Sequence, residues 1–319
     1  MVSFVTKKGG ARLNLIFDVG QICMIGEMLV KGLLDEVEEI GQRYGIVGRR
    51  KELLKMLVAV KSGRHILLEG PVGVGKTLLA RSIAEYLSRD FVRVDGDERL
   101  NETKLIGYWD PPMVLKKGYV EEAFVPGPLT RAATSGSVLF INELNRLPES
   151  AQNALLPVMD EGLIHIPHLG TLKAKEGFLI IATQNPEEDV GVLRLSEALK
   201  DRFVLVKLGY PRREEEVEIV RRHVPDIDDE TAEISVDIVR STREHPSILR
   251  GGSIRSSIDL AKIALMLRGD GDRWYNAALM VLPQRIELRD TAASKESLIR
   301  DIVRSVLGEG EGFLELRSR

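Results

Sequence analysis

The stretch that decides the fold lies at residues 70–77 and reads Gly70-Pro71-Val72-Gly73-Val74-Gly75-Lys76-Thr77. It matches the phosphate-loop pattern G-x-x-x-x-G-K-[ST] at every fixed position. Its glycines let the backbone curl so that N–H groups point at phosphates, and a following helix adds the positive end of its dipole. In such a loop Lys76 reaches the β- and γ-phosphates and the Thr77 hydroxyl binds Mg²⁺. The predicted nucleotide-binding residues here are Gly70, Pro71, Val72, Gly73, Val74, Gly75, Lys76, Thr77 and Leu78.

The sequence on both sides of this loop has the context that the pattern requires. His65–Glu69 is a short apolar run typical of a buried strand, and Thr77–Leu87 has the spacing of a helix. Short apolar runs between helical segments indicate a parallel sheet that is covered on both faces. We therefore predict an α/β fold of the phosphate-loop NTPase type. The other predicted strands are Phe91–Val94, Ser137–Ile141, Phe178–Thr183 and Phe203–Leu208, and Arg50–Lys61 is a further predicted helix.

The chain divides into three predicted parts. Residues 1–40 form an N-terminal extension, with a strand at Leu13–Val19 and a helix at Gln21–Ile40. Residues 41–209 form the α/β nucleotide-binding core. Residues 210–319 form an all-helical lid domain followed by a loose tail, Gly308–Arg319, because helical patterns dominate after Pro211.

Two segments interrupt the predicted core, and both have hairpin patterns. In Asp110–Pro128 we expect Met113–Leu115 to pair with Tyr119–Glu121. In Leu163–Lys175 we expect a turn near His168–Gly170.

The composition limits the class of protein. The 319 residues include 44% hydrophobic residues, enough for a sizeable core, and the formal net charge is only −3. Nucleic-acid binding is therefore not favoured, because it calls for a concentrated basic surface. The single cysteine, Cys23, cannot form an internal disulfide, and we see no signal peptide and no membrane span. We expect a cytoplasmic location.

Two strand ends carry candidate catalytic residues. The apolar run 138–141 ends in Asn142-Glu143. In a phosphate-loop ATPase an acid at the first of these positions holds the Mg²⁺ shell, and a glutamate at the second polarises water. Glu143 fits the second role, whereas Asn142 can contact the metal only weakly, through water, and predicts slower turnover. Asn185, after the next strand, could help to place the attacking water.

Together, these motifs resemble those of a known protein family. The order of strand, phosphate loop, Asn142-Glu143, Asn185 and helical lid resembles the AAA+ ATPases, and in particular their MoxR group. The resemblance covers roughly residues 45–268. The matching motifs are 124–129 (FVPGPL), 140–146 (FINELNR), 182–186 (ATQNP), 199–203 (LKDRF) and 252–255 (GSIR).

The resemblance implies roles for further residues. Arg202 is similar to the arginine finger that reaches into a neighbour's site, and Arg255 is similar to the lid arginine called sensor 2. Arg146 lies near the subunit interface in this pattern, and Ile46 and Val47 match the stretch that lines the adenine pocket. The alternative for each arginine is a surface salt bridge.

The two interruptions match inserts of the same clade that face the pore or the substrate. Tyr108, Trp109 and Tyr119 could then grip a client protein, or they could pack locally within their loops.

The resemblance further implies ATP and Mg²⁺ as cofactors and a homo-oligomer, usually a hexameric ring. It implies a client protein, with a von Willebrand factor A domain as one candidate partner. We therefore expect an ATPase that remodels or matures a client complex. Two alternatives stay open: a nucleic-acid motor of the related clade, and a nucleotide-gated switch that hydrolyses slowly because of Asn142.

Overall fold

The fold is known from a computed structural model, which describes residues 2–8, 11–17, 19–186, 194–290 and 294–308. These residues form two compact units. The first contains the described residues up to Leu68, those from Thr77 to Gln184, and those from 194 to Val206. The second contains Glu69–Lys76, residues 185–186, and the described residues from Lys207 onward.

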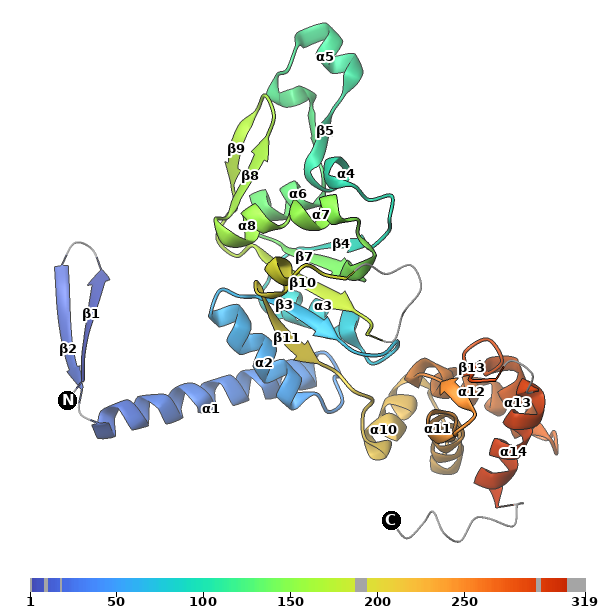
Figure 1. Ribbon diagram of the computed structural model, residues 1–319. Coiled ribbons are helices and arrows are strands. Elements are labelled where there is room, and N and C mark those ends of the chain that lie inside the picture. Colours follow the sequence, from blue (N-terminus) through green and yellow to red (C-terminus); the bar gives the residue numbers. More distant parts are fainter. Residues whose placement is uncertain (1, 9–10, 18, 187–193, 291–293, 309–319) are drawn as a thin grey trace. The chain divides into compact units, whose positions relative to one another are not determined.

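A five-stranded sheet, ordered β11-β3-β10-β7-β4, lies at the centre of the fold (Figure 1). The pairs β10–β7 and β4–β7 are parallel. The residues Val138–Ile141 of β7 are fully buried, as a strand covered on both faces should be. The α/β fold class is thus confirmed, and each predicted strand of the sheet agrees to within one residue at either end. The bounds are His65–Glu69 (β3), Phe91–Asp95 (β4), Val138–Asn142 (β7), Leu179–Gln184 (β10) and Phe203–Lys207 (β11).

Helices flank this sheet and bury their apolar faces. The helix α3 (Lys76–Tyr86) begins inside the phosphate loop and buries Leu79, Ala80 and Ile83. The helix α2 occupies Arg50–Lys61, as predicted. The other helical segments of this region are α4 (Glu102–Ile106), α6 (Pro128–Ser135), η2 (Leu144–Arg146), α7 (Glu149–Asn153), α8 (Leu156–Asp160) and α9 (Glu197–Lys200).

The N-terminal part contains a hairpin and a long helix. Strands β1 (Val2–Lys8) and β2 (Ala11–Phe17) pair antiparallel. The helix α1 (Val19–Arg43) contacts α2 and buries Ile40. The predicted strand at Leu13–Val19 overlaps β2, which begins earlier, at Ala11, and the prediction is wrong at Val19, which begins α1. The strand β1 was not predicted.

The first interruption differs from its prediction. Its strands are β5 (Gly107–Trp109) and β6 (Phe124–Pro126), which lie outside the expected hairpin. The segment Pro111–Lys117 is instead a helix, α5, followed by the 3₁₀ turn η1 (Glu121–Ala123). Proline at the first helical positions starts a helix readily, because the missing N–H has no partner there in any case. The predicted pairing of 113–115 with 119–121 is therefore wrong.

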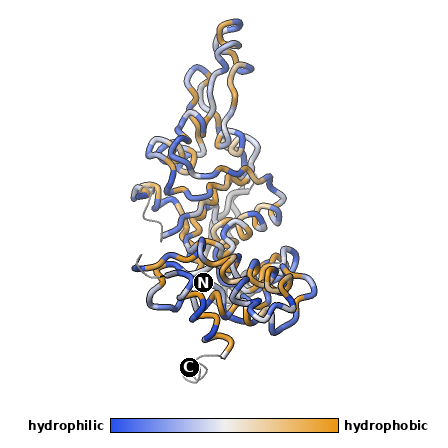
Figure 2. Tube along the Cα trace, turned by 90° about the vertical axis from the view of Figure 1, so that its right-hand side faces the viewer, coloured by the Kyte–Doolittle hydropathy of each residue, from blue (hydrophilic) through white to orange (hydrophobic). Residues whose placement is uncertain are grey.

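The second interruption is a hairpin, as predicted, with strands β8 (Leu163–Ile166) and β9 (Gly170–Lys173). In Figure 1 it lies beside the β5–β6 hairpin, and α5 forms the far end of the latter. Figure 2 shows hydrophobic and hydrophilic stretches alternating along this end of the trace. Leu115 of α5 is 88% exposed.

The second unit is mainly helical, as predicted for the region after Pro211. One core cluster includes Trp274, Leu282 and Ile299. A small antiparallel pair, β12 (Ile248–Arg250) with β13 (Glu287–Leu288), was not predicted. The predicted loose tail lies almost wholly outside the described residues. Among described residues no helix is long and apolar enough to cross a membrane. The helices are α10 (Arg213–His223), α11 (Asp229–Glu244), α12 (Ile254–Met266), α13 (Arg273–Val281) and α14 (Lys295–Leu307).

Candidate nucleotide-binding site

The phosphate loop curls around the ammonium group of Lys76. Lys76 Nζ donates hydrogen bonds to the carbonyl oxygens of Gly70 and Pro71, the latter at 2.8 Å. Gly73 and Gly75 have φ values of 81° and 95°, in the region that favours glycine. A Cβ at Gly70 would collide with the Leu208 carbonyl, so close packing against the end of β11 requires glycine there. The loop therefore holds a positive charge inside a ring of backbone, an arrangement that suits a phosphate.

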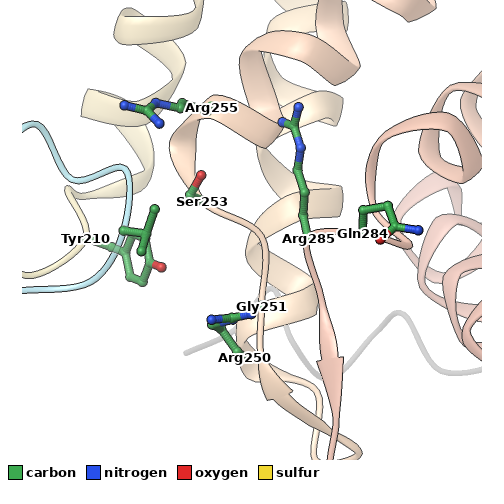
Figure 3. Close-up of a pocket in the computed structure, with 8 residues that line it drawn as sticks. Tyr210, Arg250, Gly251, Ser253, Arg255, Gln284 and Arg285 are labelled. Carbon is green, nitrogen blue, oxygen red and sulfur yellow. The ribbon is translucent and has the colours of Figure 1, made fainter. Parts of the chain in front are cut away.

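Beside the loop, the second unit has a pocket of about 350 Å³. Three arginines and no carboxylate line it, which suits an anionic ligand, although Arg250 also pairs with Glu287 and Arg285 with Asp259 outside the lining. In the view of Figure 3, Arg250 lies below the guanidinium groups of Arg255 and Arg285. The pocket is lined by Val72, Tyr210, Arg250, Gly251, Ser253, Arg255, Gln284 and Arg285. Of the predicted site residues, the pocket brings together Val72 and Arg255.

Arg285 lines this pocket and was not among the residues predicted from the sequence. Its Nη2 donates to Asp259 Oδ2 at 2.6 Å, which fixes the guanidinium. Its Nη1 is buried and has no hydrogen-bond partner among the residues that the structure describes. A buried donor without a partner is costly, and an anion in the pocket would supply one. No sequence pattern marks this residue, because it lies in an irregular connection between α13 and β13.

A buried ion pair fixes the opposite wall of the pocket. Glu216 is fully buried, and its Oε1 accepts from Arg243 Nη1 at 2.7 Å and from Arg240 Nη1 at 3.1 Å. Arg243 in turn donates to the Gly252 carbonyl at 2.6 Å and lies 3.8 Å from the centre of the Tyr210 ring. Arg243 thus positions Tyr210 and the segment that leads to Ser253 and Arg255.

The first unit contributes a hydrogen-bonded cluster at the carboxyl edge of its sheet. Asn142 Nδ2 donates to Asp95 Oδ1 at 3.1 Å, and Asn142 Oδ1 accepts from Thr183 Oγ1 at 3.1 Å. Thr183 Oγ1 accepts from the backbone N–H of Glu143 at 2.9 Å. Arg93 binds Asp95 and holds the pKa of that carboxyl below its usual range, with a smaller contribution from the Asn142 hydrogen bond. Asp95 and Thr183 were not among the predicted site residues.

Glu143 has an unusual backbone and a cationic partner. Its φ and ψ are both 57°, in the left-handed region that residues other than glycine seldom adopt. Its Oε2 lies 2.8 Å from Arg146 Nε. The carboxylate is therefore held by an arginine three residues later in the chain.

The oxygen donors at this edge fit Mg²⁺, which prefers carboxylate, hydroxyl and amide oxygens. No group of three or more His, Cys, Asp or Glu side chains that could hold a metal occurs among the residues with described positions.

The remaining predicted residues lie elsewhere. Asn185, directly after β10, is 4% exposed. Arg202 forms a two-pronged ion pair with Asp160 of α8, with Nε–Oδ1 2.6 Å and Nη2–Oδ2 2.5 Å. Ile46 is buried in the connection between α1 and α2, and Val47 follows it there.

The aromatic residues of the first interruption pack against the second one. Trp109 Nε1 donates to the Pro167 carbonyl at 3.2 Å, and its ring contacts Tyr119 edge-on at 5.1 Å. Tyr119 stacks on His168 at 4.0 Å. For Trp109 this supports local packing. Tyr108 is 51% exposed and Tyr119 52% exposed, so both still offer surface to a partner.

The sheet order, the loop after β3 and the helical second unit define the AAA+ class of ATPases. Residues 65–203 match the family model described as AAA domain (dynein-related subfamily). The uncharacterized protein YeaC of Bacillus subtilis is 30% identical over 299 residues, which cover 82% of this chain and 90% of that protein. The chain belongs to the MoxR-type AAA+ ATPases.

Two relatives with informative names align over the core only. Chaperone MoxR1 of Mycobacterium tuberculosis is 38% identical, covering 56% of this chain and 45% of that protein. Gas vesicle ATPase GvpN of Haloferax mediterranei is 36% identical, covering 57% of each. The chain thus spans about half the length of these two relatives. A RuvB variant of Thermotoga maritima shares the fold, with a TM-score of 0.51, 22% identity, and coverage of 74% of this chain and 71% of that one.

Proposed function

We propose that this protein is a ring-forming ATPase that couples ATP binding and hydrolysis to the remodelling or maturation of a client protein complex. The phosphate loop of residues 70–77 carries this proposal, supported by the arginine-lined pocket beside it. Family membership implies ATP binding. The names of two relatives, an ATPase and a chaperone, favour hydrolysis linked to work on another protein.

Binding of the ATP phosphates would use the phosphate loop and the arginine-lined pocket, which both belong to the second unit. The backbone of residues 70–75 and the Lys76 ammonium hold the phosphates, and Arg255 with Arg285 adds positive charge from the pocket wall. ATP would give the buried Nη1 of Arg285 a hydrogen-bond partner that the described part of the chain does not supply. Ile46 and Val47 are proposed to contact the adenine.

Hydrolysis would use the carboxyl edge of the sheet. Mg²⁺, when bound, neutralises the charge of the phosphate oxygens, and Thr77 together with Asn142 through water would hold it. Glu143 polarises the attacking water, and Asn185 helps to place it. Glu143 pairs with Arg146 through Oε2, so it would polarise water through Oε1 or after release of that ion pair.

Assembly would complete the site. Arg202 of one subunit is proposed to act on the phosphates bound by its neighbour, where a planar cation stabilises the charge of the transferred phosphoryl group. To do so it has to leave Asp160. We propose a homo-oligomer, most simply a hexamer, that acts on a client protein; a von Willebrand factor A domain is one candidate.

The test is the binding of a fluorescent ATP analogue to the full chain and to Lys76→Ala. We expect Lys76→Ala to lose binding by at least about 100-fold, because it removes a charge-assisted contact made inside the loop. Lys200→Ala is the matched control, since Lys200 pairs with Glu197 on the exposed face of α9. Equal affinity of wild type and Lys76→Ala would contradict the proposal.

A second candidate function is a switch that binds ATP and hydrolyses it slowly. Asn142 and the Glu143–Arg146 ion pair favour it. Tight ATP binding without phosphate release, in the presence of Mg²⁺, would distinguish this function from the first.

A further inference from the structure

Asp95 and Asn142 face each other at the ends of the neighbouring parallel strands β4 and β7. They are register partners, and Asn142 Nδ2 donates to Asp95 Oδ1 at 3.1 Å. The AAA+ pattern has a carboxylate at the position of Asn142. This chain has an amide there and a carboxylate directly beside it, so the pair carries one negative charge.

Both polar atoms of the Asn142 side chain form hydrogen bonds within the chain. Its Nδ2 donates to Asp95, while its Oδ1 accepts from Thr183 Oγ1 at 3.1 Å. An ionised aspartate at this position could accept from Thr183 but could not donate to Asp95. Two carboxylates would then repel each other at hydrogen-bond distance. The amide at 142 is therefore the residue type that Asp95 requires.

Further hydrogen bonds link this pair to the backbone of Glu143. Thr183 Oγ1 accepts from the Glu143 N–H at 2.9 Å, and the Gly96 N–H donates to the Asn142 carbonyl at 2.7 Å. A Cβ on Gly96 would collide with the Glu143 carbonyl. The ends of β4, β7 and β10 thus hold Glu143 in its left-handed conformation.

We propose that Asp95 and Asn142 form a carboxylate–amide pair in which the carboxylate lies on β4 and the amide on β7. Asp95 supplies the negative charge of this edge, and Asn142 is a positioning residue that links Asp95 to Thr183 and Glu143. Arg93 also binds Asp95, at 2.6 Å, but the Asp95 side chain keeps 60% of its surface exposed, so its charge remains available at the edge. The link to Mg²⁺ rests on the proposed ATPase function, whereas the pairing itself does not.

The first test exchanges the two residues in the full chain without nucleotide and measures thermal unfolding. Asn142→Asp places two carboxylates together, and we expect the midpoint to fall by roughly 2–4 °C. Adding Asp95→Asn to Asn142→Asp restores one carboxylate and one amide, now with the carboxylate on β7, and the midpoint should return to near the wild-type value. Asp90→Asn, the same change just before β4, is the control. An Asn142→Asp variant as stable as wild type, or additive effects in the double variant, would overturn the pairing.

The second test measures Mn²⁺ binding to the ADP-bound full chain by electron paramagnetic resonance. We expect Asp95→Asn to weaken Mn²⁺ affinity by about tenfold, equivalent to one lost charge contact, and the exchanged double variant to recover it. Unchanged affinity in Asp95→Asn would overturn the role of Asp95 at the metal. If wild type fails to bind ADP, the proposed function itself fails, while the thermal test still reports on the pair.

Discussion

At the scale of single residues, the decisive feature is the conformation of Glu143. A left-handed backbone at a residue other than glycine costs of order 1–3 kcal/mol and persists only where its surroundings impose it. Here Thr183 holds the Glu143 N–H, and Gly96 leaves room for the Glu143 carbonyl. The backbone therefore aims the carboxylate before any ligand contact is made.

A substitution at Gly96 tests this arrangement. Gly96→Ala should lower the free energy of unfolding by about 1–3 kcal/mol, because the added methyl group collides with backbone that cannot move freely. It should also lower ATP turnover, since Glu143 is displaced. Gly271→Ala is the control, because a Cβ there meets no atom within 4 Å. Wild-type stability and turnover in Gly96→Ala would show that the close approach does not position Glu143.

Candidate site residues that belong to a sequence motif could be predicted from the sequence, whereas those outside any motif could not. The phosphate loop follows a spacing that the chemistry of phosphate binding imposes, so the sequence pattern predicts a phosphate loop at residues 70–77. Arg285 and Asp95 act through neighbours far away in the chain, Asp259 and Asn142. Such pairings arise only from the folded sheet and the folded helical unit.

At the scale of elements, His65 ties β3 to β10. Its Nδ1 accepts a hydrogen bond from the Ile180 N–H at 3.0 Å, and its ring contacts Phe178 and Phe203. Burial, with a smaller contribution from Arg64, lowers the pKa of His65 from 6.5 to about 4. The strand pair is thus built around a neutral imidazole.

This burial predicts how stability depends on pH. Below pH 6.5 the unfolded chain binds a proton at His65, whereas the folded chain binds it only near pH 4. Stability is therefore lost as the pH falls toward about 4. The loss at pH 4.5 is about 2–3 kcal/mol from this group. His65→Asn keeps an acceptor for the Ile180 N–H but does not titrate. Its free energy of unfolding in urea should therefore fall between pH 7 and pH 4.5 by about 2–3 kcal/mol less than that of wild type. His165→Asn, on the exposed face of β8, is the control. An equal loss of stability in wild type and His65→Asn would contradict this role.

Elements were predictable where burial alone decides them. The strands of the sheet appear in the sequence as apolar runs because both faces are covered. In the first interruption the exposed helix α5 has no buried residue, so no apolar periodicity marks it. Its start depends on two prolines, which the sequence pattern equally allows in a turn.

At the scale of the whole molecule, the proposed site is shared between subunits. Arg202 contacts Asp160 within one chain, and the proposal requires it to act on a neighbour instead. The mainly helical second unit was predictable from the helical periodicity after Pro211. The assembly stays a prediction from the family resemblance, since it depends on surfaces that have no pattern within one sequence.

Mixed assemblies test the shared site. Lys76→Ala subunits cannot bind ATP but keep Arg202, and Arg202→Ala subunits bind ATP but lack the finger. Mixing the two should recover part of the phosphate release, because some interfaces then contain an intact site and an intact finger. Mixing Lys76→Ala with the Lys76→Ala, Arg202→Ala double variant is the control and should recover nothing. If neither mixture differs from the separate variants, Arg202 does not act between subunits.

The most direct test of the central claim is phosphate release from Mg²⁺-ATP by wild type and Glu143→Gln, with ATP binding measured on the same samples. We expect Glu143→Gln to bind ATP as tightly as wild type and to release phosphate at least about 100-fold more slowly, because it cannot polarise water. Glu149→Gln, the same change on α7, should behave as wild type. Unchanged phosphate release by Glu143→Gln, or no ATP binding by wild type, would contradict the account.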